Sequence, residues 1–314
     1  MPSRGFLFDL MDQLENGGRI HQELLTRAEA LTGRTLVVYF ANSGHPGGAM
    51  VDADPDLLEN VLRSLPGTSD SRKLDLMIAS PGGSPFAAEK IVRVCRAFST
   101  DFRTIVMGRA MSAATMLCLG SDELVMGETA SLGPIDPQML QQTGPNQQRL
   151  VAAGVIIRSF EAMLDASQKA IKEGQPADPF LHVLGTMDAR AVFEAVRANE
   201  ATSAIAKHLL DEGLLRGKTE AEISNSVESL LDAGVRGLHG KHIFPNSVTT
   251  NHGLPVTILK VGTPLDQLLR EIHLRTELYA TRKGLAKYFV TTVGGVDVSL
   301  QMMVAAAPPQ APRP

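Results

Sequence analysis

Aromatic residues are scarce in this sequence. They make up 4% of the 314 residues, and tryptophan is absent. A hydrophobic core must therefore consist mainly of aliphatic side chains, which are abundant, since hydrophobic residues total 44%. The length is typical of one large domain or two modest ones. We expect one domain, because no convincing linker interrupts the chain before its C-terminal tail.

Cysteine is also rare. The two cysteines, Cys95 and Cys118, both lie in apolar helical patterns, which is typical of small core residues and indicates neither a disulfide framework nor a metal cage. His239 and His242 lie close together in HGKHI, but no further Cys, Asp or Glu follows at convincing ligand spacing. We therefore expect no metal site and no cofactor.

Long apolar runs and long basic runs are both missing. A membrane-spanning helix needs about 20 predominantly apolar residues, so we expect no span. The N-terminal stretch MPSRGFLFDLMDQ lacks the longer apolar core and the cleavage site of a signal peptide. The formal net charge of −4 argues against nucleic acid as the main partner. These features predict a cytoplasmic protein, with a disordered Pro/Ala-rich tail over residues 301–314.

Strand and helix patterns alternate through the first half of the chain. Short β-branched and aliphatic runs predict buried strands at residues 34–42, 73–80, 102–108 and 122–127. Patterns with one apolar face predict helices at residues 9–32, 54–65, 84–98 and 111–120, with Asp54 and Ser84 as N-caps. This alternation predicts an α/β fold with a mostly parallel sheet and right-handed crossovers.

The second half of the chain, after Pro137, is mainly helical in pattern. Helical periodicity covers residues 146–174, 188–215, 219–234 and 264–283, and one late strand is predicted within residues 254–262.

Two strand-to-helix turns carry residues suited to chemistry. In open parallel sheets, ligands bind beyond the carboxyl ends of the strands. The first turn is Ser80-Pro81-Gly82-Gly83, where glycines let the backbone approach a ligand closely. Its N–H groups precede a helix and could stabilise a developing negative oxygen. An ordinary tight turn is the structural alternative.

The second turn ends at Ser112, where GRAMS leads into a helix. A hydroxyl at a helix start lies near free backbone N–H groups and the positive end of the helix dipole. The segment is not the G-x-S-x-G elbow of α/β-hydrolases, because Ala114 occupies the position of the second glycine. A plain helix cap is the alternative role for this serine.

Both turns belong to a longer pattern. The stretch LDLMIASPGG, followed by AMSAATMLCLGSDELVMGETASLGPIDPQ, resembles the serine dehydrogenase proteinase family. The resemblance covers residues 34–140 and continues more weakly over residues 239–256. The family is similar to the signal peptide peptidase A group, which implies a Clp/crotonase-like α/β fold of repeated β-β-α units with a helical C-terminal half. This domain would span residues 34–300, after an N-terminal helical segment over residues 1–33.

The resemblance also implies roles for residues in the two turns. Ser112 corresponds to the nucleophile, and the backbone N–H groups of Gly82, Gly83 and Ala113 correspond to the oxyanion hole. The family usually has glycines directly after the serine, where this chain has Ala113 and Ala114, but an alanine keeps its N–H group. The implied activity is a serine peptidase that acts on peptides or unfolded proteins and assembles into homo-oligomers.

A serine hydroxyl needs a base to take its proton. The Clp pattern uses a histidine after the serine, but this chain has no histidine between His45 and His182. The signal peptide peptidase A type implies instead a lysine that burial keeps neutral. We favour Lys169, whose neighbours in the helix are small, and Lys172 and Lys207 stay as alternatives.

Two other functions remain open. The missing histidine and the alanines that replace the glycines also fit a catalytically inactive oligomeric scaffold of the same fold. A crotonase-like acyl-CoA enzyme would share an oxyanion hole built from two backbone turns. The serine at the helix start and the S-P-G-G turn fit a peptidase better.

Overall fold

The computed structural model describes residues 17–144, 147–236 and 242–299. The predicted tail and His239 lie outside these residues. No helix in the described part of the chain is long and apolar enough to cross a membrane.

A seven-stranded sheet forms the centre of the molecule, with the strand order β11-β10-β1-β2-β3-β5-β9. The strands are β1 (Thr35–Ala41), β2 (Lys73–Ala79), β3 (Asp101–Val106), β5 (Glu123–Gly127), β9 (Thr257–Leu259), β10 (Lys287–Thr291) and β11 (Gly294–Val298). Strands β1, β2, β3, β5 and β9 are parallel, and β10 and β11 extend the sheet in antiparallel pairing. The predicted α/β fold with a mostly parallel sheet is confirmed. The C-terminal hairpin β10–β11 was not predicted.

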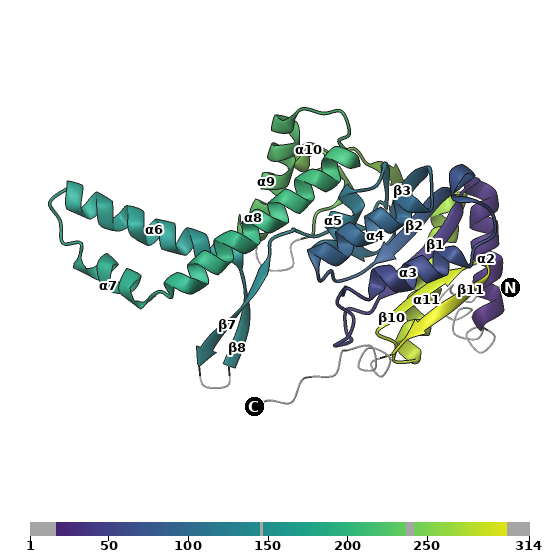
Figure 1. Cartoon of the computed structure of the whole chain (residues 1–314), viewed down its shortest axis with the longest axis horizontal. Helices are drawn as coiled ribbons and strands as arrows, with labels where there is room; N and C mark the ends of the chain where they lie inside the picture. The colour runs from purple at the N-terminus through teal and green to yellow at the C-terminus, as the bar shows by residue number, and fades with distance from the viewer. Residues whose placement is uncertain (1–16, 145–146, 237–241, 300–314) are drawn as a thin grey trace.

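Helices cover both faces of this sheet (Figure 1). One face packs against α2 (Gly17–Thr32) and α11 (Pro264–Arg282), and the other against α3 (Asp54–Arg63), α4 (Pro85–Ala97) and α5 (Ala113–Leu119). Strand β1 shows why two cores form. Val37 and Tyr39 point into the core on the α3–α4 side, whereas Val38 and Phe40 point to the α2–α11 side. A strand covered on both faces can therefore carry apolar residues at successive positions, as β1 does.

The helix starts depend on local chemistry in different ways. Ser84 caps α4 as predicted, because its side chain accepts the N–H of Ala87, and Pro85 follows it. Asp54 does not cap α3, although that role was predicted. It is the first helical residue, and its carboxylate bonds to Lys287 from the other end of the chain. A local capping pattern was overridden by a tertiary ion pair.

An arm projects from the sheet domain (Figure 1). It consists of the hairpin β7 (Gln138–Gly144) and β8 (Gln147–Ala152), then α6 (Ala153–Lys172), α7 (Asp178–Thr186) and the first part of α8 (Ala189–Glu212). The prediction of one helix over residues 146–174 was wrong in its first part, because residues 147–152 pair with β7 as a strand. The rest of α8 returns to the core, where α9 (Glu220–Arg236) and α10 (Pro245–His252) complete the helical layer.

The arm exposes many large apolar side chains. These are Leu140, Leu150, Val155, Leu164, Ile171, Leu181, Val183 and Phe193. An exposed apolar surface of this kind is typical of a protein contact site.

Candidate active site

Ser112 has a strained backbone. The short strand β4 (Arg109–Ala110) leads through Met111 to Ser112, which has φ 51° and ψ −120°. Among the described residues it is the one non-glycine residue with positive φ. Such a conformation costs about 1–3 kcal/mol and occurs preferentially at functional sites. Ser112 occupies the N-cap position of α5, but its side chain makes no capping hydrogen bond, so the plain cap role has no support.

A network of buried hydrogen bonds holds this strained turn. The N–H of Met111 donates to the carbonyl of Ser80, and the N–H of Ser80 donates to the carbonyl of Arg109, both at 3.0 Å. The hydroxyl oxygen of Thr115 lies 2.8 Å from the carbonyl oxygens of Ala110 and Gly133. These bonds fix the serine turn beside the turn that begins at Ser80.

The two turns approach each other so closely that only glycine fits. A Cβ atom on Gly82, at φ 93°, would lie 2.4 Å from the carbonyl oxygen of Met111 and 2.7 Å from the Cβ of Ser112. A Cβ atom on Gly83, at φ 151°, would lie 2.3 Å from the carbonyl oxygen of Met50. Both glycines are therefore required by positive φ and by close backbone contact.

The backbone donors at the two turns are not equivalent. The N–H of Gly82 donates to the hydroxyl of Ser80 at 3.1 Å. Within the described part of the chain, the N–H groups of Gly83 and Ala113 have no acceptor. Ala113 is buried, where an N–H group normally finds a partner, whereas Gly83 is exposed. Both donors stay available to a ligand, while the third predicted donor is already engaged.

Ser112, Gly82, Gly83 and Ala113 line one cavity of about 490 Å³. Its other walls are largely apolar and come from α4, α5, the segment before β7 and α8, namely from Phe86, Met116, Ile135, Ala198 and Ala201 among others. None of the residues that line it, in the part of the chain described, has a titratable side chain. The structure brings together the predicted nucleophile and oxyanion residues, but it adds no base.

The predicted lysines lie elsewhere in the chain. The side chain of Lys169 is 75% exposed and lies 3.9 Å from a carboxylate oxygen of Glu173 in the arm. Lys172 is also exposed, Lys207 is half-buried, and none of the three lines the cavity. The structure therefore does not place a candidate base beside Ser112 within one chain.

Sequence reasoning missed one buried lysine. Lys287 on β10 is fully buried, and its Nζ lies 2.7 Å from both carboxylate oxygens of Asp54. Burial lowers the pKa of Lys287 and outweighs the opposing effect of Asp54. Lys287 does not line the Ser112 cavity either. Its position at the start of the apolar run KYFV was a signal that could have revealed it.

His242, considered above as a metal ligand, has a structural partner. Its Nδ1 lies 2.8 Å from the hydroxyl oxygen of Ser131. The described residues contain no group of three or more His, Cys, Asp or Glu side chains that could hold a metal ion.

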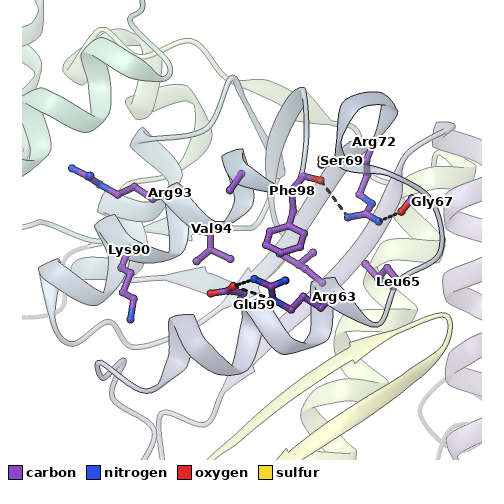
Figure 2. A pocket seen from close by; sticks show the side chains of 12 residues that line it. Glu59, Arg63, Leu65, Gly67, Ser69, Arg72, Lys90, Arg93, Val94 and Phe98 are labelled. Carbon is purple, nitrogen blue, oxygen red and sulfur yellow. Dashed lines mark hydrogen bonds and ion pairs between the residues drawn. The ribbon is translucent and has the colours of Figure 1, made fainter.

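A larger cavity, of about 680 Å³, lies between α3 and α4, and we call it the charged groove (Figure 2). Arg63, Lys90 and Arg93 each lie within 2.8 Å of a carboxylate oxygen. Arg72 donates to backbone carbonyls, among them that of Phe98 at 3.3 Å. The cations of the groove are thus already paired within the protein, and the groove contains none of the predicted site residues.

Comparisons with known proteins identify a family that this chain matches. A family model described as ClpP-like SDH-type serine proteinase matches residues 51–210, which include both turns. Two uncharacterized proteins of Methanocaldococcus jannaschii are similar. One is 33% identical over 120 residues, which cover 37% of this chain and 42% of that protein. The other is 31% identical over 117 residues, which cover 37% and 40%. The match thus spans less than half the length of each relative.

Two solved structures share a distant likeness. A mutant of the 1510-N membrane-bound stomatin-specific protease aligns with a TM-score of 0.41 and 14% identity, over 71% of this chain and 79% of that one. A ClpP1 mutant from Listeria monocytogenes aligns with a TM-score of 0.38 and 13% identity, over 76% and 98%.

Proposed function

The chain belongs to the ClpP-like SDH-type serine proteinase family, and we propose that it cleaves peptide bonds through an acyl-enzyme at Ser112. One observation supports this most: the strained serine lines the same cavity as two backbone N–H groups that lack an acceptor in the described residues. A nucleophile and preorganised donors around one small volume are what acyl transfer requires.

In the proposed reaction, the Oγ of Ser112 attacks the carbonyl carbon of the peptide bond while a base takes its proton. The N–H groups of Gly83 and Ala113 stabilise the negative oxygen of the tetrahedral intermediate. The base then gives the proton to the leaving amine, and an ester to the serine remains. Water, deprotonated by the same base, hydrolyses this ester and restores the hydroxyl. Gly82, the third proposed oxyanion residue, acts mainly by lacking a side chain.

We propose that the base comes from a second copy of the chain in a homo-oligomer. Lys169 is largely exposed on the arm, and the described residues that line the cavity include no titratable side chain. The exposed apolar side chains of the arm supply a surface for association. Lys172 and Lys207 are the alternatives.

The cavity also suggests the substrate. Its apolar walls favour a peptide or unfolded protein with an apolar side chain before the scissile bond. Action without a cofactor and a cytoplasmic location stay predictions. The family assignment argues against an acyl-CoA substrate.

A fluorophosphonate probe, which reacts with activated serines, tests this function. We expect the wild-type chain to be labelled and Ser112→Ala to be unlabelled. Ser99→Ala is a matched control, because the hydroxyl of Ser99 donates to a local carbonyl, that of Cys95, and Ser99 does not line the Ser112 cavity. Equal labelling of Ser112→Ala would contradict the proposal.

The inactive scaffold is the second candidate, and the lack of a titratable side chain in the described cavity walls favours it. An oligomeric wild-type protein that resists the probe at every pH tested would support the scaffold over the peptidase.

A further inference from the structure

A buried ion pair lies one short loop away from the glycine turn. The Nζ of Lys287 donates to both carboxylate oxygens of Asp54 at 2.7 Å, and the two side chains are 0% and 1% exposed. The same carboxylate accepts the hydroxyl of Tyr39 and the backbone N–H of Val51, both at 2.9 Å. Three segments of the chain, at residues 39, 51–54 and 287, thus meet at one carboxylate.

A gain in folding stability is not a sufficient reason for a buried ion pair of this kind. Removing two charges from water is costly, and replacing a buried pair by apolar residues is often neutral or stabilising. Here the carboxylate of Asp54 is fully hydrogen-bonded, and Tyr39 also stacks on Phe289 with ring centroids 4.5 Å apart. Four hydrogen bonds at this carboxylate join the segments that supply the donors.

The loop before Asp54 leads directly to the proposed oxyanion donor. Met50, next to Val51, donates its N–H to the carbonyl of Gly82 at 2.7 Å. The carbonyl of Met50 accepts the N–H of Ser84 at 2.9 Å. Gly83 therefore lies between two hydrogen bonds to one residue, with Met50 backbone atoms 2.3–2.4 Å from where its Cβ would be. Any shift of Met50 must move the N–H of Gly83.

We propose that Asp54, Lys287 and Tyr39 are positioning residues, which hold the Met50–Val51 segment so that the N–H of Gly83 points into the Ser112 cavity. The inference rests on the proposed peptidase function. Tyr39 and Lys287 lie outside the segment that the family model matches, whereas Asp54 lies inside it. The group therefore links the matched segment to strand β10 near the end of the chain.

The chain offers a matched control for this group. Asp75 is 1% exposed and lies near the amino-terminal end of the central strand β2, where it bonds to the guanidinium groups of Arg34 and Arg103. Like Asp54, it is a buried carboxylate paired with cations, but none of its bonds leads to the glycine turn. Asp54→Asn and Asp75→Asn therefore remove equivalent charges with different expected consequences.

The test compares these two variants with the wild type in the full chain. Thermal midpoints, the rate of fluorophosphonate labelling, and hydrogen exchange of the segment 80–86 are measured at a temperature where all proteins are folded. We expect both variants to lower the thermal midpoint. Asp54→Asn alone should slow labelling by about 10- to 100-fold, the size of effect that a misplaced donor has, and should speed exchange in the segment 80–86.

A double variant separates positioning from stability. Asp54→Asn combined with Lys287→Met removes both buried charges, so we expect its thermal midpoint to recover relative to Asp54→Asn alone. Its labelling rate should stay low, because the carboxylate that binds Val51 is still missing. Tyr39→Phe should give a smaller decrease in labelling in the same direction.

The outcomes distinguish this inference from the proposed function. If the wild type is labelled and Asp54→Asn matches its labelling rate and its exchange, the positioning role is wrong and the peptidase remains. If Asp75→Asn slows labelling equally, or the double variant recovers both properties, the role is also wrong. If the wild type is not labelled, the peptidase fails, and faster exchange confined to Asp54→Asn would still support the structural link to the turn.

Discussion

Two cavities of this protein differ in what their walls offer a ligand. The charged groove between α3 and α4 is the larger, at about 680 Å³, but its cations already bind carboxylates or carbonyls. Figure 2 shows these interactions for Arg63 and Arg72. The Ser112 cavity is smaller, at about 490 Å³, and combines apolar walls with backbone donors that have no acceptor among the described residues. A ligand in the groove must compete with existing ion pairs, whereas a carbonyl oxygen beside Ser112 meets donors that are already oriented.

The larger of these two cavities is thus not the one that we propose as the active site. The informative signals are the backbone strain at Ser112 and the buried N–H group of Ala113, which has no acceptor in the described chain, because folding normally removes both. Changes at the Ser112 cavity should therefore alter chemistry, and matched changes at the charged groove should not.

The largest effect is expected from Gly83→Ala. The new Cβ would collide with the backbone of Met50, so the turn must move and carry the Gly83 N–H away from the cavity. We expect the labelling rate to fall by about 100-fold or more. Gly67→Ala is the matched control, because Gly67 lines the charged groove with φ 88° and has open space around it. Equal losses in both variants would remove the distinction between the two cavities.

The next largest effect concerns the pH dependence of folding stability, and it involves a histidine that lines neither cavity. His21 on α2 is 3% exposed, its Nε2 lies 3.0 Å from the hydroxyl oxygen of Thr276 on α11, and burial lowers its pKa from 6.5 to about 4. Folding favours the neutral ring, so this stability is complete above pH 6.5 and is lost as the pH falls toward 4. Between pH 7 and pH 5 the free energy of unfolding should drop by about 2 kcal/mol through this group.

Urea unfolding at the two pH values checks this prediction. His21→Gln should show a smaller drop than the wild type, and an unchanged drop would contradict the role of His21. Because His21 lies on the opposite face of the sheet from Ser112, the variant should keep the labelling rate of the folded protein.

A smaller change is expected from filling the Ser112 cavity. Ala201 on α8 lines it, so Ala201→Phe should lower kcat/KM for peptides with a large apolar residue before the scissile bond by about 10-fold. Peptides with alanine at this position should lose less. Ala204→Phe is the control, because Ala204 is an exposed residue of α8 outside the cavity lining. Loss of activity that does not depend on the size of the peptide side chain would contradict this pocket assignment.

The smallest effect should come from the charged groove itself. Arg93 is 65% exposed and pairs with Glu89 at 2.8 Å, and such surface pairs contribute about 0–1 kcal/mol. Arg93→Ala should therefore leave the labelling rate within about twofold of the wild type. A decrease of the size expected for Gly83→Ala would mean that the groove is coupled to the proposed site.

Local sequence patterns predicted those strands and helix starts that depend on neighbouring residues. Apolar runs located β1, β2, β3 and β5, and Ser84 with Pro85 located the start of α4. The strand at 147–152 was predicted as helix, because its apolar spacing continues into α6 and only pairing with β7 makes it extended. The role of Asp54 depends on Lys287, which lies 233 residues away in the sequence. Strand β10 depends on pairing with β1, near the other end of the chain. No local sequence window contains either pair.

The sequence by itself determined the two turns, their glycines and the serine between a strand and a helix, because residue type limits which backbone angles and which side-chain contacts a turn allows. Only the tertiary structure decided that Ser112 adopts a positive φ and that Gly82 gives its N–H to Ser80, while those of Gly83 and Ala113 find no acceptor in the described chain. It also decided that Lys169, on helix α6 of the arm, does not line the Ser112 cavity. The reason is physical: strain and hydrogen-bond satisfaction are properties of segments packed together, and distant strands and helices set them.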